Sequence, residues 1–149
     1  MTMLIIRPEQ LEVFRPVAEA AFERRVIEYL RENHADEVVV LPAGEREKKE
    51  IEVKGLDDET LNKLVRTGID RARSYGMTWE SSITAFVVLM FIVAPNFDEH
   101  PLIRRALRDG KVEPNLRVEE IWDRTTNENW EVARYSYDAS GWGINLEKG

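Results

Sequence analysis

Apolar positions recur every three or four residues along most of the chain, which is the period of an amphipathic helix. This spacing runs over residues 16–33 and again after Asp57 and Asp58, with charged residues in the positions between. Each segment is expected to form a helix, the second with one of the two aspartates as its N-cap and Gly76 at its end. Pro8 suits the first turn of a shorter helix before residue 16. The residues expected to face the core are Ala18, Phe22, Val26, Tyr29, Leu30, Leu61, Leu64, Val65, Ile69 and Ala72.

Residues 83–94 are apolar at nearly every position, which predicts a helix that other elements surround on most sides. Thr78 is the expected N-cap, Glu80 suits the positive end of the helix dipole, and Pro95 ends the helix. The apolar run to Pro95 spans about 13 residues, whereas a membrane-spanning helix needs about 20. The segment therefore predicts the central helix of a water-soluble bundle.

A different pattern occupies residues 38–53. Residues 38–41 are valine and leucine, a polar loop with Gly44 follows, and Ile51 and Val53 alternate with charged residues. Short alternating runs rich in β-branched residues favour strands. We expect a small β-hairpin that packs on the helices or pairs with another chain, because an isolated hairpin is only marginally stable.

The last third of the chain predicts shorter helices. One is expected to begin at Asp98 or His100 and to close at Gly110, and Pro114 opens a longer helical segment. Residues 125–129 are weak helix formers, so this segment is either one long helix or two helices separated by a bend.

Together these patterns predict a mainly α protein. The expected architecture is a compact bundle of about five to six helices around the central helix, residues 83–94, with a small β-hairpin over residues 38–53. We expect residues 1–138 to form a single helical domain and the glycine-containing residues 139–149 to form an irregular C-terminal tail. A chain of 149 residues has the usual size of one domain.

Composition narrows the classes of function. Asp and Glu outnumber Lys and Arg by 28 to 21, for a net charge of -7. Nucleic-acid binding is disfavoured because phosphate contacts need clustered Lys and Arg, whereas a basic or neutral protein partner is compatible with this charge. The absence of cysteine excludes disulfides and thiolate metal sites and fits a reducing compartment. The first ten residues show no secretory signal pattern, so a cytoplasmic location is expected.

No combination of residues predicts a catalytic site, a metal site or a cofactor. His34 and His100 lie near expected helix boundaries, where an imidazole commonly meets backbone groups. The acidic pairs Asp57-Asp58 and Glu119-Glu120 fall in expected first turns, where carboxylates are favourable without any ligand. In an alternative interpretation, Asp98 and Glu99 orient His100 in a small carboxylate- or histidine-dependent enzyme.

Aromatic residues gather in the second half of the chain, some of them in unusual places for a core. Trp79 lies in a first helical turn, and Trp142 stands between two glycines. Aromatic side chains fill cores and also anchor interfaces, so these residues either pack over the edge of the bundle or form a partner surface. The candidate partner-binding residues are Trp79, Phe97, Asp98, His100, Trp130, Tyr137 and Trp142.

One stretch of sequence is similar to a known group of proteins. Residues 64–78 read LVRTGIDRARSYGMT, and Phe91 and the turn Asn96-Phe97-Asp98 follow. This pattern resembles that of small bacterial proteins encoded beside type VI secretion spike (PAAR-like) proteins and their toxic effectors, and it covers about residues 10–110. The resemblance implies a cytoplasmic accessory protein that binds a secreted effector or a spike component, as loading chaperone, adaptor or immunity protein. It supplies no catalytic residues, and residues 36–55 are longer than the corresponding link in those proteins.

The leading hypothesis is therefore a non-catalytic protein-binding accessory factor of a bacterial secretion or toxin system. The alternatives are the small enzyme and a self-associating structural component in which the hairpin of residues 38–53 pairs between chains. None of the three interpretations calls for a cofactor, a nucleic acid or a membrane.

Overall fold

The structure is a computed structural model that describes the backbone of residues 8–148 and the side chains of residues 19–147. Residues 1–7, where no secretory signal is expected, lie outside this range, as does the side chain of Ala18. The described part of the chain is mainly α, with six helices and one two-stranded antiparallel hairpin, as predicted. In chain order the elements are α1 (Pro8–Asn33), β1 (Val38–Pro42), β2 (Lys48–Glu52), α2 (Asp58–Ser74), α3 (Glu80–Ile92), α4 (Pro101–Leu107), α5 (Arg117–Arg124) and α6 (Asn127–Tyr135).

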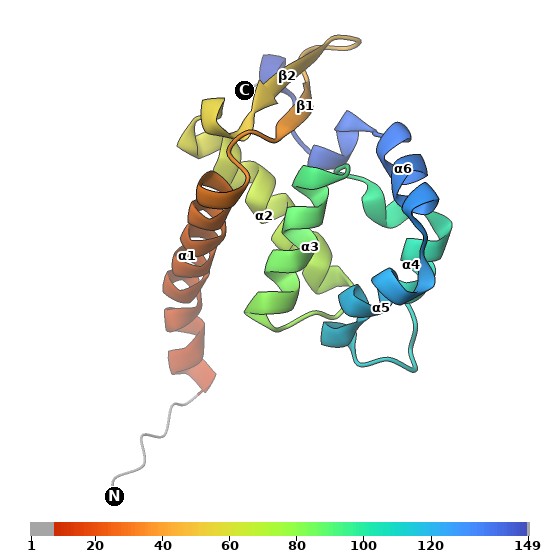
Figure 1. Ribbon diagram of the computed structural model, residues 1–149. Coiled ribbons are helices and arrows are strands. Elements are labelled where there is room, and N and C mark those ends of the chain that lie inside the picture. The colour runs from red at the N-terminus through yellow and green to blue at the C-terminus, as the bar shows by residue number, and fades with distance from the viewer. Residues whose placement is uncertain (1–7, 149) are drawn as a thin grey trace, which may run out of the picture.

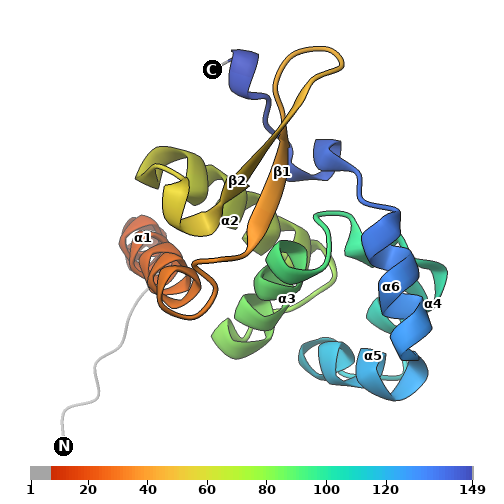
Figure 2. The ribbon, with the colours of Figure 1, turned by 45° about the horizontal axis from the view of Figure 1, so that its top comes forward.

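The helices surround α3 unevenly. In Figure 1, α1 runs along one side of the molecule, α2 and α3 cross its middle, and α4, α5 and α6 form the opposite side. The hairpin lies at one end, and Figures 1 and 2 both place the last residues of the chain beside it. No helix in residues 8–148 combines the length and the apolar character that a membrane crossing requires.

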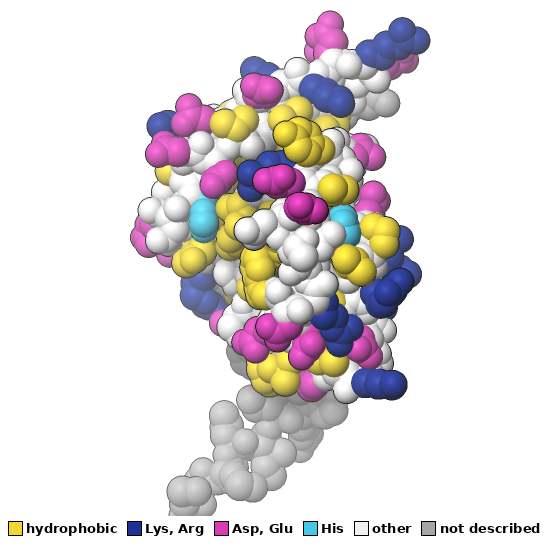
Figure 3. Space-filling view, turned by 45° about the vertical axis from the view of Figure 1, so that its right-hand side comes forward, with side chains coloured by type: hydrophobic (Ala, Val, Ile, Leu, Met, Phe, Trp, Pro, Cys, Tyr) yellow, Lys and Arg dark blue, Asp and Glu magenta, His cyan; other side chains and the backbone are white. Residues whose placement is uncertain are grey.

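The hairpin forms where the alternating pattern predicts it. Val38 lies opposite Glu52 in the antiparallel register. Val39 and Leu41 of β1 are fully buried, so one face of the hairpin packs on the helical core. Residues 45–50 are exposed, and this end projects from the top of the molecule with side chains of both charges (Figure 3).

The boundaries of α2 follow from its own sequence. The carboxylate of Asp57 accepts a hydrogen bond from the backbone N–H of Thr60 at 2.7 Å, which makes Asp57 the N-cap. Gly76, just after the helix, has a φ of 94°, a conformation that favours glycine. Every apolar residue that the spacing assigned to the core of α2 is buried.

The predicted central position of α3 is confirmed where it packs against its neighbours. Ile83, Phe86, Val87 and Met90 are buried. The helices α2 and α3 approach so closely that a Cβ on Gly68 would lie 2.9 Å from a methyl group of Val87. The remaining side of α3 is only half-buried.

Three local expectations need correction. The prolines predicted two helices, but the backbone forms one continuous α1, with Pro8 as its first residue and Pro16 in its interior. Pro8 suits a first turn, where its missing N–H costs nothing, whereas Pro16 removes one backbone hydrogen bond without ending the helix. Thr78 does not cap α3. Trp79 occupies the N-cap position, and the side-chain oxygen of Asn115 accepts from the backbone N–H groups of both residues, each at 2.8 Å. The helix α4 ends at Leu107, before Gly110.

The long C-terminal segment forms two helices, one of the two alternatives that its weak helix formers allowed. Thr126 begins α6 with a capping box, in which its side chain and that of Asn129 each bond the other's backbone N–H. The residues after Tyr137 then fold back onto the core. They form short 3-10 turns, Ala139–Trp142 and Leu146–Lys148, and Trp142 is fully buried against Phe91, with ring centroids 4.8 Å apart.

Candidate functional site

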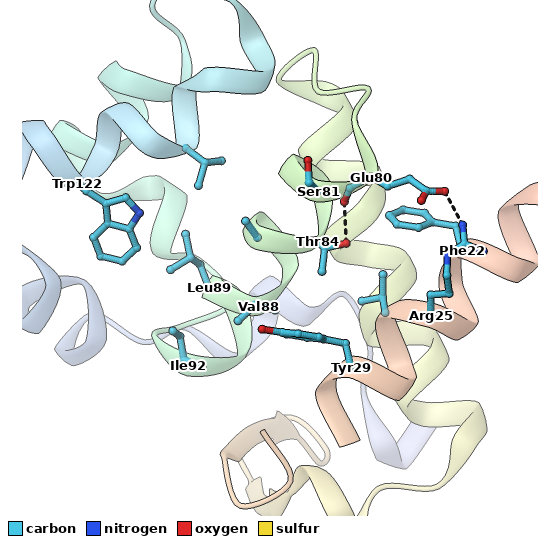
Figure 4. Close-up of a pocket in the computed structure, with 13 residues that line it drawn as sticks. Phe22, Arg25, Tyr29, Glu80, Ser81, Thr84, Val88, Leu89, Ile92 and Trp122 are labelled. Carbon is cyan, nitrogen blue, oxygen red and sulfur yellow. Dashed lines mark hydrogen bonds and ion pairs between the residues drawn. The ribbon is translucent and has the colours of Figure 1, made fainter. Parts of the chain in front are cut away.

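An apolar groove of about 560 Å³ opens between α1, α3 and α5, and we call it the α1–α3–α5 groove (Figure 4). Its floor is α3, and the other two helices form its walls. The residues that line it are Phe22, Arg25, Val26, Tyr29, Glu80, Ser81, Thr84, Ala85, Val88, Leu89, Ile92, Val118 and Trp122.

The floor of the groove exists because α3 is apolar on more sides than its neighbours cover. Ala85, Val88 and Ile92 recur at intervals of three and four residues, which places them in one stripe along the helix. All three are only half-buried. From Ser81 to Ile92, at about 1.5 Å per residue, the stripe extends about 16 Å, or three helical turns. The groove therefore has the length of a short helix.

Two aromatic side chains stand at the rims of the groove. Tyr29 of α1 is 44% exposed and Trp122 of α5 is 53% exposed. Figure 4 shows them on opposite sides of the α3 floor, with Val88 and Ile92 between them. The Trp122 ring stacks on that of Trp130 with centroids 4.6 Å apart, which holds it in place. Large, ordered, exposed aromatic side chains are typical anchors of protein interfaces.

Only two charged residues line the groove, and they neutralise each other. Arg25 of α1 and Glu80 of α3 form an ion pair at 2.5 Å at one end (Figure 4). Both side chains are more than half exposed, so solvent screens the pair and it adds little to stability. Apart from this pair and the hydroxyl groups of Tyr29, Ser81 and Thr84, the lining is apolar.

Three of the predicted partner-binding residues are inaccessible to a partner. Phe97, Asp98 and Trp142 are all buried. Phe97 packs on Phe86 with ring centroids 4.9 Å apart, and Trp142 donates a hydrogen bond from its indole N–H to Tyr137. Trp142 stands between glycines because the C-terminal segment folds back into the core. None of the three side chains can therefore contact a partner.

Asp98 belongs to a buried polar cluster that joins distant segments. One carboxylate oxygen accepts from the hydroxyl of Tyr75 at 2.7 Å, and the other lies 3.5 Å from the guanidinium of Arg71. Arg71 also donates to the backbone carbonyls of Pro95 and Gly141. Burial, followed by the hydrogen bond to Asp98, raises the pKa of Tyr75 to about 12. Arg71 and Tyr75 therefore hold α2 against the turn after α3.

The predicted residues that remain partly accessible are not gathered in one place. Trp79 is 51% exposed but lies outside the groove lining. The ring of Trp130 stacks on that of Trp122. The hydroxyl of Tyr137 accepts from the backbone N–H of Val40 at 2.9 Å, so this side chain fastens the hairpin to the C-terminal segment.

His100, and not Asp98, is the N-cap of α4. Its Nδ1 accepts from the backbone N–H of Leu102 at 3.2 Å. His100 and Glu99 line a second hollow of about 540 Å³ together with Asn96 and Asp138.

The polar groups of that second hollow are engaged locally. Asn96 donates to the carbonyl of Ser136 at 2.9 Å and accepts from the N–H of Asp138 at 2.9 Å. The carboxylate of Asp138 accepts from the backbone and side chain of Ser140, which lowers its pKa. These contacts give no support to the enzyme interpretation. In the part of the chain whose side chains are described, no three His, Asp or Glu residues converge as metal ligands would.

Sequence reasoning missed the residues that form the groove. Trp122 was not among the candidate partner-binding residues, and Tyr29 was assigned to the core. One signal was available: a helix that is apolar all round needs cover on every side, and the short elements of this chain do not provide it. Comparison with known proteins adds no further guide, because no family model, no curated protein and no solved structure matches the chain.

Proposed function

We propose that this chain is a non-catalytic protein-binding accessory factor that holds an amphipathic helix of another protein in the α1–α3–α5 groove. The observation that supports this most directly is the uncovered apolar stripe of α3, with Tyr29 and Trp122 at its two sides. A groove between two helices that is about three turns long suits the apolar face of a third helix. Residues of the partner at positions i, i+3, i+4 and i+7 would meet the stripe.

The resemblance to type VI-associated proteins gives the first partners to test. In this proposal the partner is a secreted effector or a spike component, and the chain acts in the cytoplasm as a loading chaperone, adaptor or immunity protein. Co-expression distinguishes these roles. An immunity protein abolishes the toxicity of a neighbouring gene product, whereas a chaperone raises its soluble yield or its export without changing its activity.

The groove itself is tested with a synthetic helical peptide of about four turns that carries three leucines on one face. Isothermal titration calorimetry measures its affinity for the unmodified chain, for Val88→Glu and for Trp122→Ala. Val88→Glu places a charge on the apolar floor, and Trp122→Ala removes one rim. Each variant is expected to weaken binding at least tenfold, because a buried charge or a lost aromatic anchor costs well over ~1.4 kcal/mol.

Trp79→Ala is the matched control for Trp122→Ala, because Trp79 is exposed to the same degree but lies outside the groove. It is expected to leave the affinity unchanged. Circular dichroism establishes that each variant is folded. The proposal fails if the peptide does not bind, or if both groove variants bind it as well as the unmodified chain.

Self-association through the hairpin remains the competing proposal. The exposed residues of β2 are Lys48, Lys49, Glu50 and Glu52. Charged side chains along an edge strand discourage pairing with another edge. Multi-angle light scattering measures the mass in solution, and a dimer that Ile51→Pro converts to a monomer would favour the hairpin interface over the groove.

A further inference from the structure

We infer that the α1–α3–α5 groove selects helices whose apolar stripe is flanked by lysine or arginine. This inference rests on the proposed function and specifies the partner that fits it. It follows from the charges that stand just outside the apolar lining, on both walls.

The α5 wall carries two exposed carboxylates beside its aromatic anchor. Glu119 precedes Trp122 by three residues and Asp123 follows it directly, and both side chains are exposed. On a helix with about 100° between successive residues, both carboxylates lie on the solvent side of Trp122 and away from buried Ile121. A helix seated against Trp122 would therefore place one of its flanks next to them.

The α1 wall has a similar arrangement. Glu32 follows Tyr29 by three residues, so the two side chains are neighbours on the surface of α1, and Glu32 is exposed. Among the described side chains, no lysine or arginine forms an ion pair with Glu32, Glu119 or Asp123. These carboxylates are available to a partner.

Two cations contact residues that line the groove. Arg25 pairs with Glu80, whereas Arg134 donates to the carbonyl of Ile92 at 3.3 Å and keeps its positive charge against the three carboxylates Glu32, Glu119 and Asp123. Arg124 of α5 pairs with Asp109 and Glu120, away from the groove lining. The rim is thus net negative within a chain of net charge -7.

Such a rim distinguishes partner helices by the charge of the residues beside their apolar stripe. Lysine and arginine can lay their aliphatic stems along an apolar helix face and extend the charge to its edge. Three exposed pairs that each contribute a factor of about two would favour a basic flank about tenfold over a neutral one. Acidic flanks would be repelled, and salt would weaken both effects.

The test uses two peptides with the same leucine stripe, one with lysines and one with glutamates beside the stripe. Calorimetry at about 50 mM and about 500 mM salt spans strong and weak screening. The lysine peptide is expected to bind at least tenfold more tightly at low salt, with the difference shrinking at high salt. The triple variant Glu32→Gln, Glu119→Gln, Asp123→Asn is expected to remove most of this preference.

The matched control is Glu45→Gln, Glu47→Gln, Glu50→Gln on the hairpin, which changes the net charge by the same amount away from the groove. It is expected to retain the preference. If both triple variants reduce the preference equally, net charge alone acts and the inference is overturned. If the two peptides bind the unmodified chain equally but Trp122→Ala weakens both, the inference fails while the proposed function stands. If neither peptide binds, the proposed function fails as well.

Discussion

At the scale of single residues, the hydroxyl of Tyr75 is held by the polar cluster around Asp98. It donates to Asp98 at 2.7 Å, and its ring packs beside Phe86 with centroids 5.8 Å apart. Ionising this phenol would place a charge in a partly buried site, and it would set that charge next to the buried carboxylate of Asp98. The folded chain therefore holds the phenolic proton more tightly than an unfolded chain does, which the raised pKa of about 12 expresses.

This raised pKa predicts a loss of stability at high pH. A group whose pKa is higher in the folded state than in the unfolded state stabilises the fold. Its contribution is complete below the pKa of the unfolded state, about 10, and is lost as the pH rises through the pKa of the folded state. The free energy of unfolding is expected to fall between about pH 10 and about pH 12, and to fall less steeply in Tyr75→Phe. Urea unfolding at a series of pH values measures both slopes.

Tyr135→Phe is the control, because this side chain is 90% exposed. Tyr137, whose pKa is also raised by burial, is present in all three proteins and contributes equally to each slope. Identical pH slopes for the unmodified chain and Tyr75→Phe would contradict the prediction.

At the scale of secondary-structure elements, α3 begins with help from a distant segment. Asn115, in the short turn Pro114–Leu116, accepts from the N–H groups of Thr78 and Trp79, and its own carbonyl accepts from the hydroxyl of Ser82 at 2.8 Å. A helix start leaves several N–H groups without partners inside the helix. Here a side chain about 36 residues away in sequence satisfies two backbone N–H groups at this start.

Asn115→Ala is therefore expected to destabilise the fold by about 2 kcal/mol, because two backbone N–H groups lose their acceptor. Thr78→Ala removes the hydroxyl that spacing alone predicted to be the cap. Here that hydroxyl accepts from the side-chain amide of Asn115 at 3.1 Å, and its loss is expected to cost about 1 kcal/mol. Guanidinium unfolding of both variants measures the difference. If Thr78→Ala lowers the free energy of unfolding as much as Asn115→Ala or more, the prediction is wrong.

At the scale of the whole molecule, the C-terminal segment closes the fold. Trp142 fills the space beside Phe91, and Gly141 accepts from Arg71 of α2. Farther along, the side chain of Asn145 exchanges two hydrogen bonds with the backbone of Gly44 in the hairpin loop, at 2.9 and 2.8 Å. The segment thereby joins α2, α3 and the hairpin.

The core position of Trp142 predicts a large effect of its removal. Trp142→Ala is expected to destabilise the fold by about 3–5 kcal/mol, the usual cost of truncating a buried tryptophan. Trp79→Ala, which removes the same side chain from a half-exposed site, is expected to cost less than about 1 kcal/mol. Chemical unfolding measures both losses, and similar values for the two variants would contradict the assigned burial of Trp142.

The elements of this protein follow from local sequence. Helical spacing, strand alternation, the Asp57 cap and the Gly76 stop each depend on residues within about four positions of one another, so they could be predicted without coordinates. The same local rules located α3 and indicated that it is apolar all round. They also predicted the hairpin, because its turn and strands are contiguous in the chain.

The candidate site could not be predicted in this way, because only tertiary packing decides which side of an apolar helix stays uncovered. The burial of Trp142 depends on Phe91, which is more than 50 positions away in the chain. The half-exposure of Tyr29 likewise depends on groove residues more than 50 positions away. The sequence alone determined what each segment becomes and how much apolar surface it carries. The packing of distant segments determined where that surface remained open, because burial depends on the shape of every neighbour at once.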